Sequence, residues 1–80
     1  MEIRLLAFGI VKEIFKVNLM EISLPEGSTV DVLRKNLEHE FPAIKRLSTY
    51  MIAVNNEYAA EDVILKAQDE IAIIPPVSGG

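Results

Sequence analysis

A chain of 80 residues has room for a single domain with one small core. Half of its residues are apolar, its formal net charge is −4, and it contains no cysteine. The acidic balance argues against a nucleic-acid ligand, because phosphate backbones are bound by clustered positive charge. The missing thiols exclude disulfides, cysteine-based zinc sites and an internal thiol nucleophile.

The hydropathy of the chain and its first residues indicate in which compartment of the cell we expect the protein. No stretch approaches the roughly 20 apolar residues that cross a bilayer. The start, Met1 to Arg4, lacks the basic region and apolar run of a signal peptide, so we expect a cytoplasmic protein. The mean hydropathy of +0.26 is high for a small domain, which leads us to expect apolar surface that a partner covers.

The first part of the chain predicts two strands. Residues 2–8 form an apolar run with side chains of this kind on both faces, which is typical of a central strand. Residues 17–24 alternate apolar and polar side chains, as a half-buried strand does. A helical turn over residues 10–15 separates them. The two strands are therefore close enough in sequence to pair antiparallel.

The main helix is expected next. Ser28 or Thr29 caps its start, and the spacing of Ser28 and Asp31 resembles a capping box. Pro42 ends it, because proline has no backbone N–H for a helical hydrogen bond. Apolar residues at helical spacing predict the buried stripe. These residues are Val30, Val32, Leu33, Leu37 and Phe41.

The second half predicts three more strands and a further helical turn. Ile44 and Leu47 are expected to anchor the connector over residues 43–48. Asn55-Asn56 is typical of a tight hairpin turn. Acidic residues at the start of residues 61–65 favour one helical turn there, and the chain turns again before its last strand. We expect these strands over residues 50–55, 57–59 and 70–74.

A single main helix covers only one face of a sheet of four or five strands. Alternation in the first and last strands sends one apolar set toward the helix and a second set to the uncovered face. The second set consists of Leu6, Phe8, Ala72 and Ile74. We expect it to form a partner-binding patch near the end of the last strand, with Phe8 as its test residue. The alternative is that loops cover these side chains.

The C-terminal hexapeptide Pro75-Pro76-Val77-Ser78-Gly79-Gly80 follows the last strand directly. Prolines donate no backbone hydrogen bond, so strand pairing must stop at Pro75, and they stiffen the exit. Gly79 and Gly80 have no Cβ to obstruct entry into a narrow slot of another protein. We therefore predict a domain over residues 1–75 and an extended tail over residues 76–80. We expect the Gly80 carboxylate to be the reactive group of the tail. The alternative is that the chain end is inert.

The rest of the chain offers no internal active site. His39 is expected to be a solvated residue near the end of the main helix. The acidic pairs Glu61-Asp62 and Asp69-Glu70 are adjacent in sequence and read as solvated turns. No phosphate-binding loop or nucleophile elbow is present. We expect neither a metal site nor a bound cofactor.

The element order and the ending resemble the ubiquitin-like β-grasp sulfur carriers, in particular the small subunits of molybdopterin synthase. The resemblance implies an α+β fold of the β-grasp type. It has a mixed four- to five-stranded sheet, one main helix and a protruding C-terminal Gly-Gly tail. Gly9 and Lys12 depart from the pattern, since the family more often has alanine and arginine there. The segments that carry the resemblance are Phe8 with Lys12-Glu13, Ala53-Val54-Asn55-Asn56-Glu57, Asp69-Glu70-Ile71-Ala72 and the C-terminal hexapeptide.

This resemblance implies a carrier cycle at Gly80. An activating enzyme uses ATP to convert the carboxylate to an acyl-adenylate, because a carboxylate is a poor electrophile until its oxygen can leave. A sulfur donor protein then replaces AMP, which leaves a thiocarboxylate. The tail over residues 76–80 inserts into the large subunit, which Pro75 and Phe8 also contact, and its sulfur passes to cyclic pyranopterin phosphate to form the molybdopterin dithiolene. The chain would be a covalently loaded cosubstrate within a heterotetramer, and no enzyme on its own.

Other functions stay open at this point. A related ubiquitin-like carrier would deliver sulfur to tRNA thiolation or thiazole synthesis. A protein modifier would join Gly80 to lysines through an isopeptide bond. A plain interaction domain would keep full function without Gly79 and Gly80.

Overall fold

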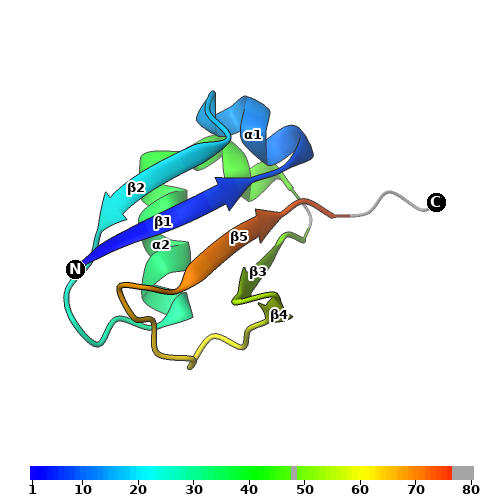
Figure 1. The fold of residues 1–80 in the computed structure, drawn as a ribbon. Coiled ribbons are helices and arrows are strands. Elements are labelled where there is room, and N and C mark those ends of the chain that lie inside the picture. The colour runs from blue at the N-terminus through cyan, green and yellow to red at the C-terminus, as the bar shows by residue number, and fades with distance from the viewer. Residues whose placement is uncertain (48, 77–80) are drawn as a thin grey trace.

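The computed structural model describes residues 1–47 and 49–76, which form a five-stranded sheet with its main helix laid across one face (Figure 1). The predictions for Val77, Ser78, Gly79 and Gly80 concern residues outside that range. The elements are β1 (Glu2–Ala7), α1 (Gly9–Phe15), β2 (Leu19–Ser23), α2 (Val30–Glu40), the 3-10 helix η1 (Pro42–Arg46), β3 (Met51–Val54), β4 (Glu57–Tyr58) and β5 (Glu70–Ile74).

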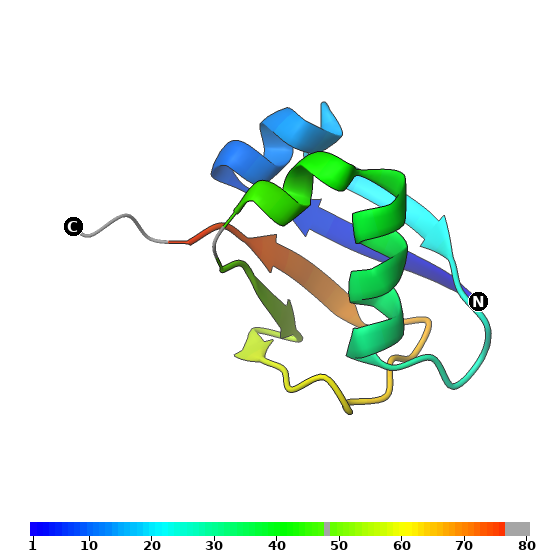
Figure 2. The same ribbon diagram turned by 180° about the vertical axis from the view of Figure 1, so that it is seen from behind.

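The sheet is mixed, in the order β2-β1-β5-β3-β4. The central strands β1 and β5 run parallel, whereas the other neighbouring strands are antiparallel. Seen from behind, α2 crosses the sheet and covers that face (Figure 2). This arrangement confirms the predicted α+β β-grasp fold with one main helix, and it leaves the face seen in Figure 1 open.

The core lies between α2 and the covered face of the sheet. Alternate residues of the two central strands point into it and are completely buried, as their apolar pattern predicts. The rings of Phe15 and Phe41 lie 4.6 Å apart between centroids, which ties the end of α1 to the end of α2. The completely buried side chains of β1, α2, η1, β3 and β5 include Ile3, Leu5, Val30, Leu33, Leu37, Ile44, Ile52, Ile71 and Ile73.

The predicted cap of α2 by Thr29 is confirmed, whereas the capping box of Ser28 with Asp31 and the burial of Val32 are wrong. Thr29 is the cap, its Oγ1 accepting from the Val32 N–H at 3.4 Å, while the Ser28 hydroxyl donates to the Pro25 carbonyl at 2.7 Å. Ser28 therefore forms no capping box, and Asp31 instead forms an ion pair with Lys35. The Val32 side chain is 40% exposed, because it lies about 200° around the helix from Val30, outside the buried stripe.

The predicted helical turn over residues 61–65 is also wrong. This segment runs alongside the start of α2 and forms an isolated antiparallel bridge between Thr29 and Ile64. Its carbonyls accept hydrogen bonds from the first residues of α2, with Val30 donating to Val63 at 2.9 Å and Asp31 to Glu61 at 3.0 Å. Because the first turn of a helix has no internal acceptors for its N–H groups, this tertiary pairing outweighs the local preference for a helix.

The Asn55-Asn56 turn is confirmed, and side chains fasten it to β5. Asn55 and Asn56 have φ angles of +52° and +70°, which are characteristic of the tightest hairpin turns. The Asn55 amide donates to Asp69 Oδ1 at 3.0 Å and accepts from the Glu70 N–H at 2.9 Å. Asp69 Oδ2 also accepts from the Lys66 N–H at 2.8 Å. Asp69 is thus a structural residue rather than merely a solvated one.

The connector after α2 folds as η1, followed by Leu47. Ile44 of η1 is completely buried and Leu47 is half-buried, so both predicted anchors are confirmed. Among the residues that the structure describes, no helix is long and apolar enough to cross a membrane.

Candidate functional site

The candidate site begins where β5 ends. Ile74 is the last residue of β5 and pairs with Met51 of β3, while Ile73 pairs with Ala7 of β1. Pairing therefore stops at Pro75, as predicted from its missing N–H. The side chains of Pro75 and the following proline are half-buried, so the start of the tail packs against the domain. This contact determines how the chain leaves the sheet.

An uninterrupted row of apolar residues crosses the open face beside this exit. Strand register places one such residue from each strand next to its neighbour, with Leu6 of β1 between a β2 and a β5 residue. Along the row from β2 to β4 stand Leu19, Leu6, Ala72, Ala53 and Tyr58. A second group, closer to the exit, contains Phe8, Ile74 and Met51. We call these eight residues together the apolar face.

Phe8 occupies a prominent place on the apolar face. It follows β1 in an extended conformation and is 50% exposed. Its side chain borders a shallow hollow of about 330 Å³ that Tyr58 and Ile74 also line. The predicted patch of Leu6, Phe8, Ala72 and Ile74 is thus present on the uncovered face and is not buried under loops. Partner binding by Phe8 itself stays a prediction.

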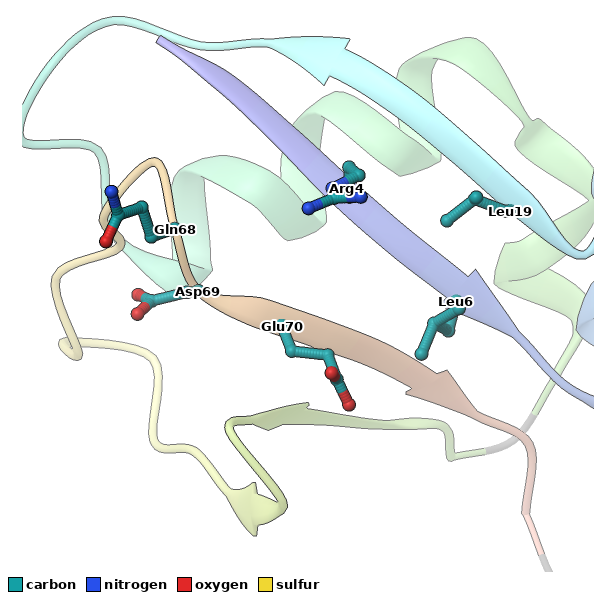
Figure 3. Close-up of a pocket in the computed structure, with 6 residues that line it drawn as sticks. All are labelled: Arg4, Leu6, Leu19, Gln68, Asp69 and Glu70. Carbon is teal, nitrogen blue, oxygen red and sulfur yellow. The ribbon is translucent and has the colours of Figure 1, made fainter.

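The opposite end of the same face is charged. Arg4 of β1 stands in register between Glu21 of β2 and Glu70 of β5, and opposite charges on adjacent strands attract each other. Figure 3 shows Arg4 and Leu6 on one face of β1, above a hollow of about 250 Å³. The face is therefore polar where β1 begins and apolar where it ends. A partner that covers the apolar part of this face would therefore also cover the point where the chain leaves β5.

Sequence reasoning missed half of the apolar face. Leu19, Met51, Ala53 and Tyr58 complete it. The spacing of Met51 and Ala53 carries a weak signal, because residues two apart in a strand share a face. Which of the two faces they share depends on pairing with β5, which a single sequence does not state.

Of the other polar residues singled out in the sequence, Glu70 lines the hollow beside Phe8, whereas His39 and Glu61 lie elsewhere. His39 is exposed near the end of α2, as predicted. Glu61 lies 3.5 Å from Arg34 Nε, on the side of the main helix. Within residues 1–47 and 49–76 no group of three or more His, Asp or Glu side chains is placed to hold a metal ion.

Tyr50 has the one strongly perturbed pKa among the described residues. Burial is the main cause that raises the pKa of Tyr50 to about 12, and the Glu38 carboxylate, which accepts the phenol hydrogen bond at 2.8 Å, contributes to the same rise. The Arg34 guanidinium, 5.0 Å from the ring centroid, opposes this rise in pKa. These residues join α2 to the start of β3 and hold that strand beside the exit.

We expect alkaline unfolding to report on Tyr50. Because its pKa is higher in the folded protein than the ordinary value of 10.0, its contribution to stability is complete below pH 10 and is lost as the pH rises toward about 12. A spectroscopic tyrosinate titration of Tyr58→Phe, which leaves Tyr50 alone, should show a midpoint near 12. Glu38→Gln should lower that midpoint only in part, since burial remains. A midpoint near 10 for the single tyrosine of Tyr58→Phe would contradict the assignment.

The chain is similar to known proteins along nearly its whole length. The ThiS family model matches residues 5–80. A molybdopterin synthase sulfur carrier subunit of Dictyostelium discoideum is 40% identical over 84 residues, which span 99% of this chain and 96% of that protein. SAMP1 of Haloferax volcanii is 25% identical with a TM-score of 0.85, and 100% of both chains is covered.

A third comparison concerns a protein complex. The structure of subunits 1 and 2 of molybdopterin-converting factor from Helicobacter pylori contains a chain that matches this one with a TM-score of 0.71. The two chains are 27% identical, and 100% of each is covered.

Proposed function

Because this chain belongs to the ThiS family, we infer that it is the sulfur carrier subunit of a molybdopterin synthase. The observation that carries this conclusion is its similarity, over 99% of its length, to a relative of that name. It is a carrier subunit rather than an enzyme in its own right. The fold agrees with this function, because it places a broad apolar face beside the exit of a Gly-Gly-ended tail.

The chemistry that we propose takes place at Gly80. ATP in the activating enzyme adenylates the carboxylate and releases pyrophosphate, which turns one carboxylate oxygen into a leaving group. Sulfur from a donor protein then displaces AMP and leaves a terminal thiocarboxylate. Since this chain has no cysteine, none of its own side chains can intercept the adenylate as a thiol. ATP is bound by the activating enzyme and not by the carrier, and we place both in the cytoplasm.

The loaded chain then meets the large subunit. The Helicobacter pylori complex of subunits 1 and 2 supports a large-subunit partner. We propose that the apolar face docks on that subunit, with Phe8 and Pro75 in contact with it beside the exit, and that the tail over residues 76–80 enters it. The thiocarboxylate sulfur there attacks a carbon of cyclic pyranopterin phosphate and displaces an oxygen substituent, and hydrolysis of the resulting thioester leaves the sulfur on the pterin and returns the Gly80 carboxylate. Because the dithiolene has two sulfurs, two loaded carriers are used per product. Acid and base catalysts for this transfer come from the large subunit.

Mass spectrometry tests this function directly. The carrier is incubated with an activating enzyme, ATP and a sulfur donor, and its intact mass is measured. We expect a gain equal to the replacement of one oxygen by sulfur, which fragmentation places on Gly80. Oxidation of Met1, Met20 or Met51 adds almost the same mass, so alkylation of the thiocarboxylate is the control. A terminus that stays a carboxylate under these conditions would overturn the proposal.

Full-length similarity to SAMP1, a small archaeal modifier protein, keeps a protein modifier as a second candidate. A modifier would form isopeptide bonds between Gly80 and lysines of other proteins. An extract of the native host, separated under denaturing and reducing conditions, distinguishes a protein modifier from a sulfur carrier. Lysine adducts of Gly80 would support modification, whereas a free thiocarboxylate form alone would support the carrier.

A further inference from the structure

The hollow beside Phe8 is made by two small side chains in the middle of the apolar face. Ala53 of β3 and Ala72 of β5 pair in register and form its floor. Because an alanine side chain ends at Cβ, the surface of the sheet is depressed there, which leaves a hollow of about 330 Å³. Phe8 and Ile74 line the end nearer the exit of the chain, and Tyr58 of β4 lines one side. This part of the hollow is therefore apolar.

The other end of the hollow is polar and carries a carboxylate. Glu70, two residues before Ala72 and on the same face of β5, lines this end together with Asn56. Arg4 stands next to Glu70 in register, but the ion pairs among residues 1–47 and 49–76 do not include one between them. Figure 3 shows the Glu70 carboxylate turned away from Arg4 and toward β3.

Backbone and side-chain hydrogen bonds hold the polar end in place. The Glu70 N–H donates to Asn55 Oδ1 at 2.9 Å, and the Glu70 carbonyl accepts from the Asn55 N–H at 2.8 Å. The turn that carries Asn56 is thus fastened to β5 before any partner binds. A site that is already ordered binds at a lower entropic cost.

A partner that covers the apolar face also removes Glu70 from water. Burial of a carboxylate without an opposite charge is costly, so an apolar side chain in the hollow would leave an unfavourable unpaired charge beside it. A cationic side chain with an aliphatic stem matches both ends of the hollow. Its stem packs on the alanine floor, and its charge reaches Glu70.

We propose that the hollow receives an arginine side chain of the large subunit, which forms an ion pair with Glu70. This inference deepens the proposed function and rests on it. Arginine matches the site better than lysine, because its planar guanidinium donates two parallel hydrogen bonds to a carboxylate and stacks on aromatic rings. The Tyr58 ring, 68% exposed, provides such a surface, and the Asn56 amide oxygen provides a further acceptor.

A pair of matched variants tests the charge of the hollow. Glu70→Gln keeps the size of the side chain and the backbone bonds of the turn, and removes the charge. Glu21→Gln removes the same charge from the same row of the sheet, on the far side of Arg4 and outside the hollow. In calorimetric titrations with the large subunit, Glu70→Gln should raise the Kd at least about tenfold and Glu21→Gln less than about twofold. Both side chains are exposed, so circular dichroism should show both variants folded.

A third variant tests whether Glu70 finds its partner within the carrier. If Arg4 turned toward Glu70 on docking, the carboxylate would need no charge from the large subunit. Arg4→Gln would then weaken binding as much as Glu70→Gln. We expect it instead to change the Kd less than about twofold, as rim charges do.

A double-mutant cycle identifies the arginine. Each surface arginine of the large subunit is replaced by glutamine in turn, and its Kd is measured with the parent carrier and with Glu70→Gln. One replacement should weaken binding of the parent about tenfold but binding of Glu70→Gln less than about twofold, because the ion pair is already lost.

A titration of the free carrier does not depend on the proposed function. N-acetyl-arginine amide is added to the isotope-labelled protein, and backbone amide signals are followed by NMR. Signals of Asn56, Glu70 and Ala72 should shift with its concentration, and by less with N-acetyl-lysine amide. Glu70→Gln should lose these shifts.

Three results would overturn the inference. They are an equal Kd for Glu70→Gln and the parent, an effect of Arg4→Gln as large as that of Glu70→Gln, and a cycle in which no arginine is coupled to Glu70. A large subunit that does not bind the parent carrier would instead reject the proposed function. The titration of the free carrier would then decide, and an absence of shifts around the hollow would overturn the inference as well.

Discussion

Deletion of Gly80 is expected to abolish sulfur loading and leave the fold intact. The shortened chain still ends in a glycine carboxylate, but that group lies about 3.3 Å short of its reaction position. A misplacement of even about 1 Å can cost roughly 100-fold in rate, so we expect the loading rate to fall at least that much. The core is unaffected, since the last completely buried residue of β5 is Ile73.

The measurement combines loading, followed by intact mass, with denaturant unfolding. The free energy of unfolding should change by less than about 0.5 kcal/mol, as for surface changes away from packed groups. Gly80→Ala is the matched control, because it keeps the length of the tail and adds only a methyl group at the reacting residue. It should load more slowly than the parent but faster than the deletion. Loading of the deletion variant at the parent rate would show that Gly80 is not the reacting residue.

Phe8→Glu is expected to prevent docking on the large subunit. The side chain is half exposed and stands on the apolar face, so the free carrier tolerates a charge there. In the complex, the carboxylate would lose its water without gaining a partner. Truncation of central aromatic residues in interfaces typically costs 2 kcal/mol or more, so we expect the Kd to rise at least about 30-fold. Calorimetric titration with the large subunit measures it.

A matched control shows whether the effect belongs to the apolar face. Val32→Glu places the same charge at a side chain that is 40% exposed on α2, on the other face of the sheet. It should bind like the parent. Circular dichroism must show both variants folded, which we expect because the Phe8 carbonyl still accepts from the Val11 N–H at 3.0 Å. Equal Kd values for Phe8→Glu and the parent would remove the apolar face from the docking surface.

Local rules predicted most of the secondary structure. The last strand, residues 70–74, has the bounds expected from its apolar run and from the following proline. The turn at Asn55-Asn56 followed from the tolerance of asparagine for positive φ angles. Each of these signals lies within a few residues of the structure that it specifies. This is why one sequence was sufficient.

The predictions that failed did so because another hydrogen-bond partner was available, in one case far away in the chain and in the other close by. Residues 61–65 carry acids suited to a helix start, but the unpaired N–H groups of α2 recruit their carbonyls instead. Ser28 was a plausible cap by spacing, yet its hydroxyl bonds to Pro25 and Thr29 caps the helix. A segment distant in the chain decided the first case, and the Pro25 carbonyl three residues earlier decided the second. Nothing in the residues themselves ranks those alternatives.

By itself, the sequence predicted that the candidate chemistry belongs to the Gly80 carboxylate, and it identified half of the apolar face. A tail with two prolines and two terminal glycines, in a chain without cysteine, indicates a reactive carboxylate carried by a rigid domain. Only the tertiary structure assembled Leu19, Leu6, Ala72, Ala53 and Tyr58 into one row, because strand order and register join residues far apart in the chain. The hollow beside Phe8 exists for the same reason: strand pairing brings Ala53 of β3 and Ala72 of β5 together as its floor.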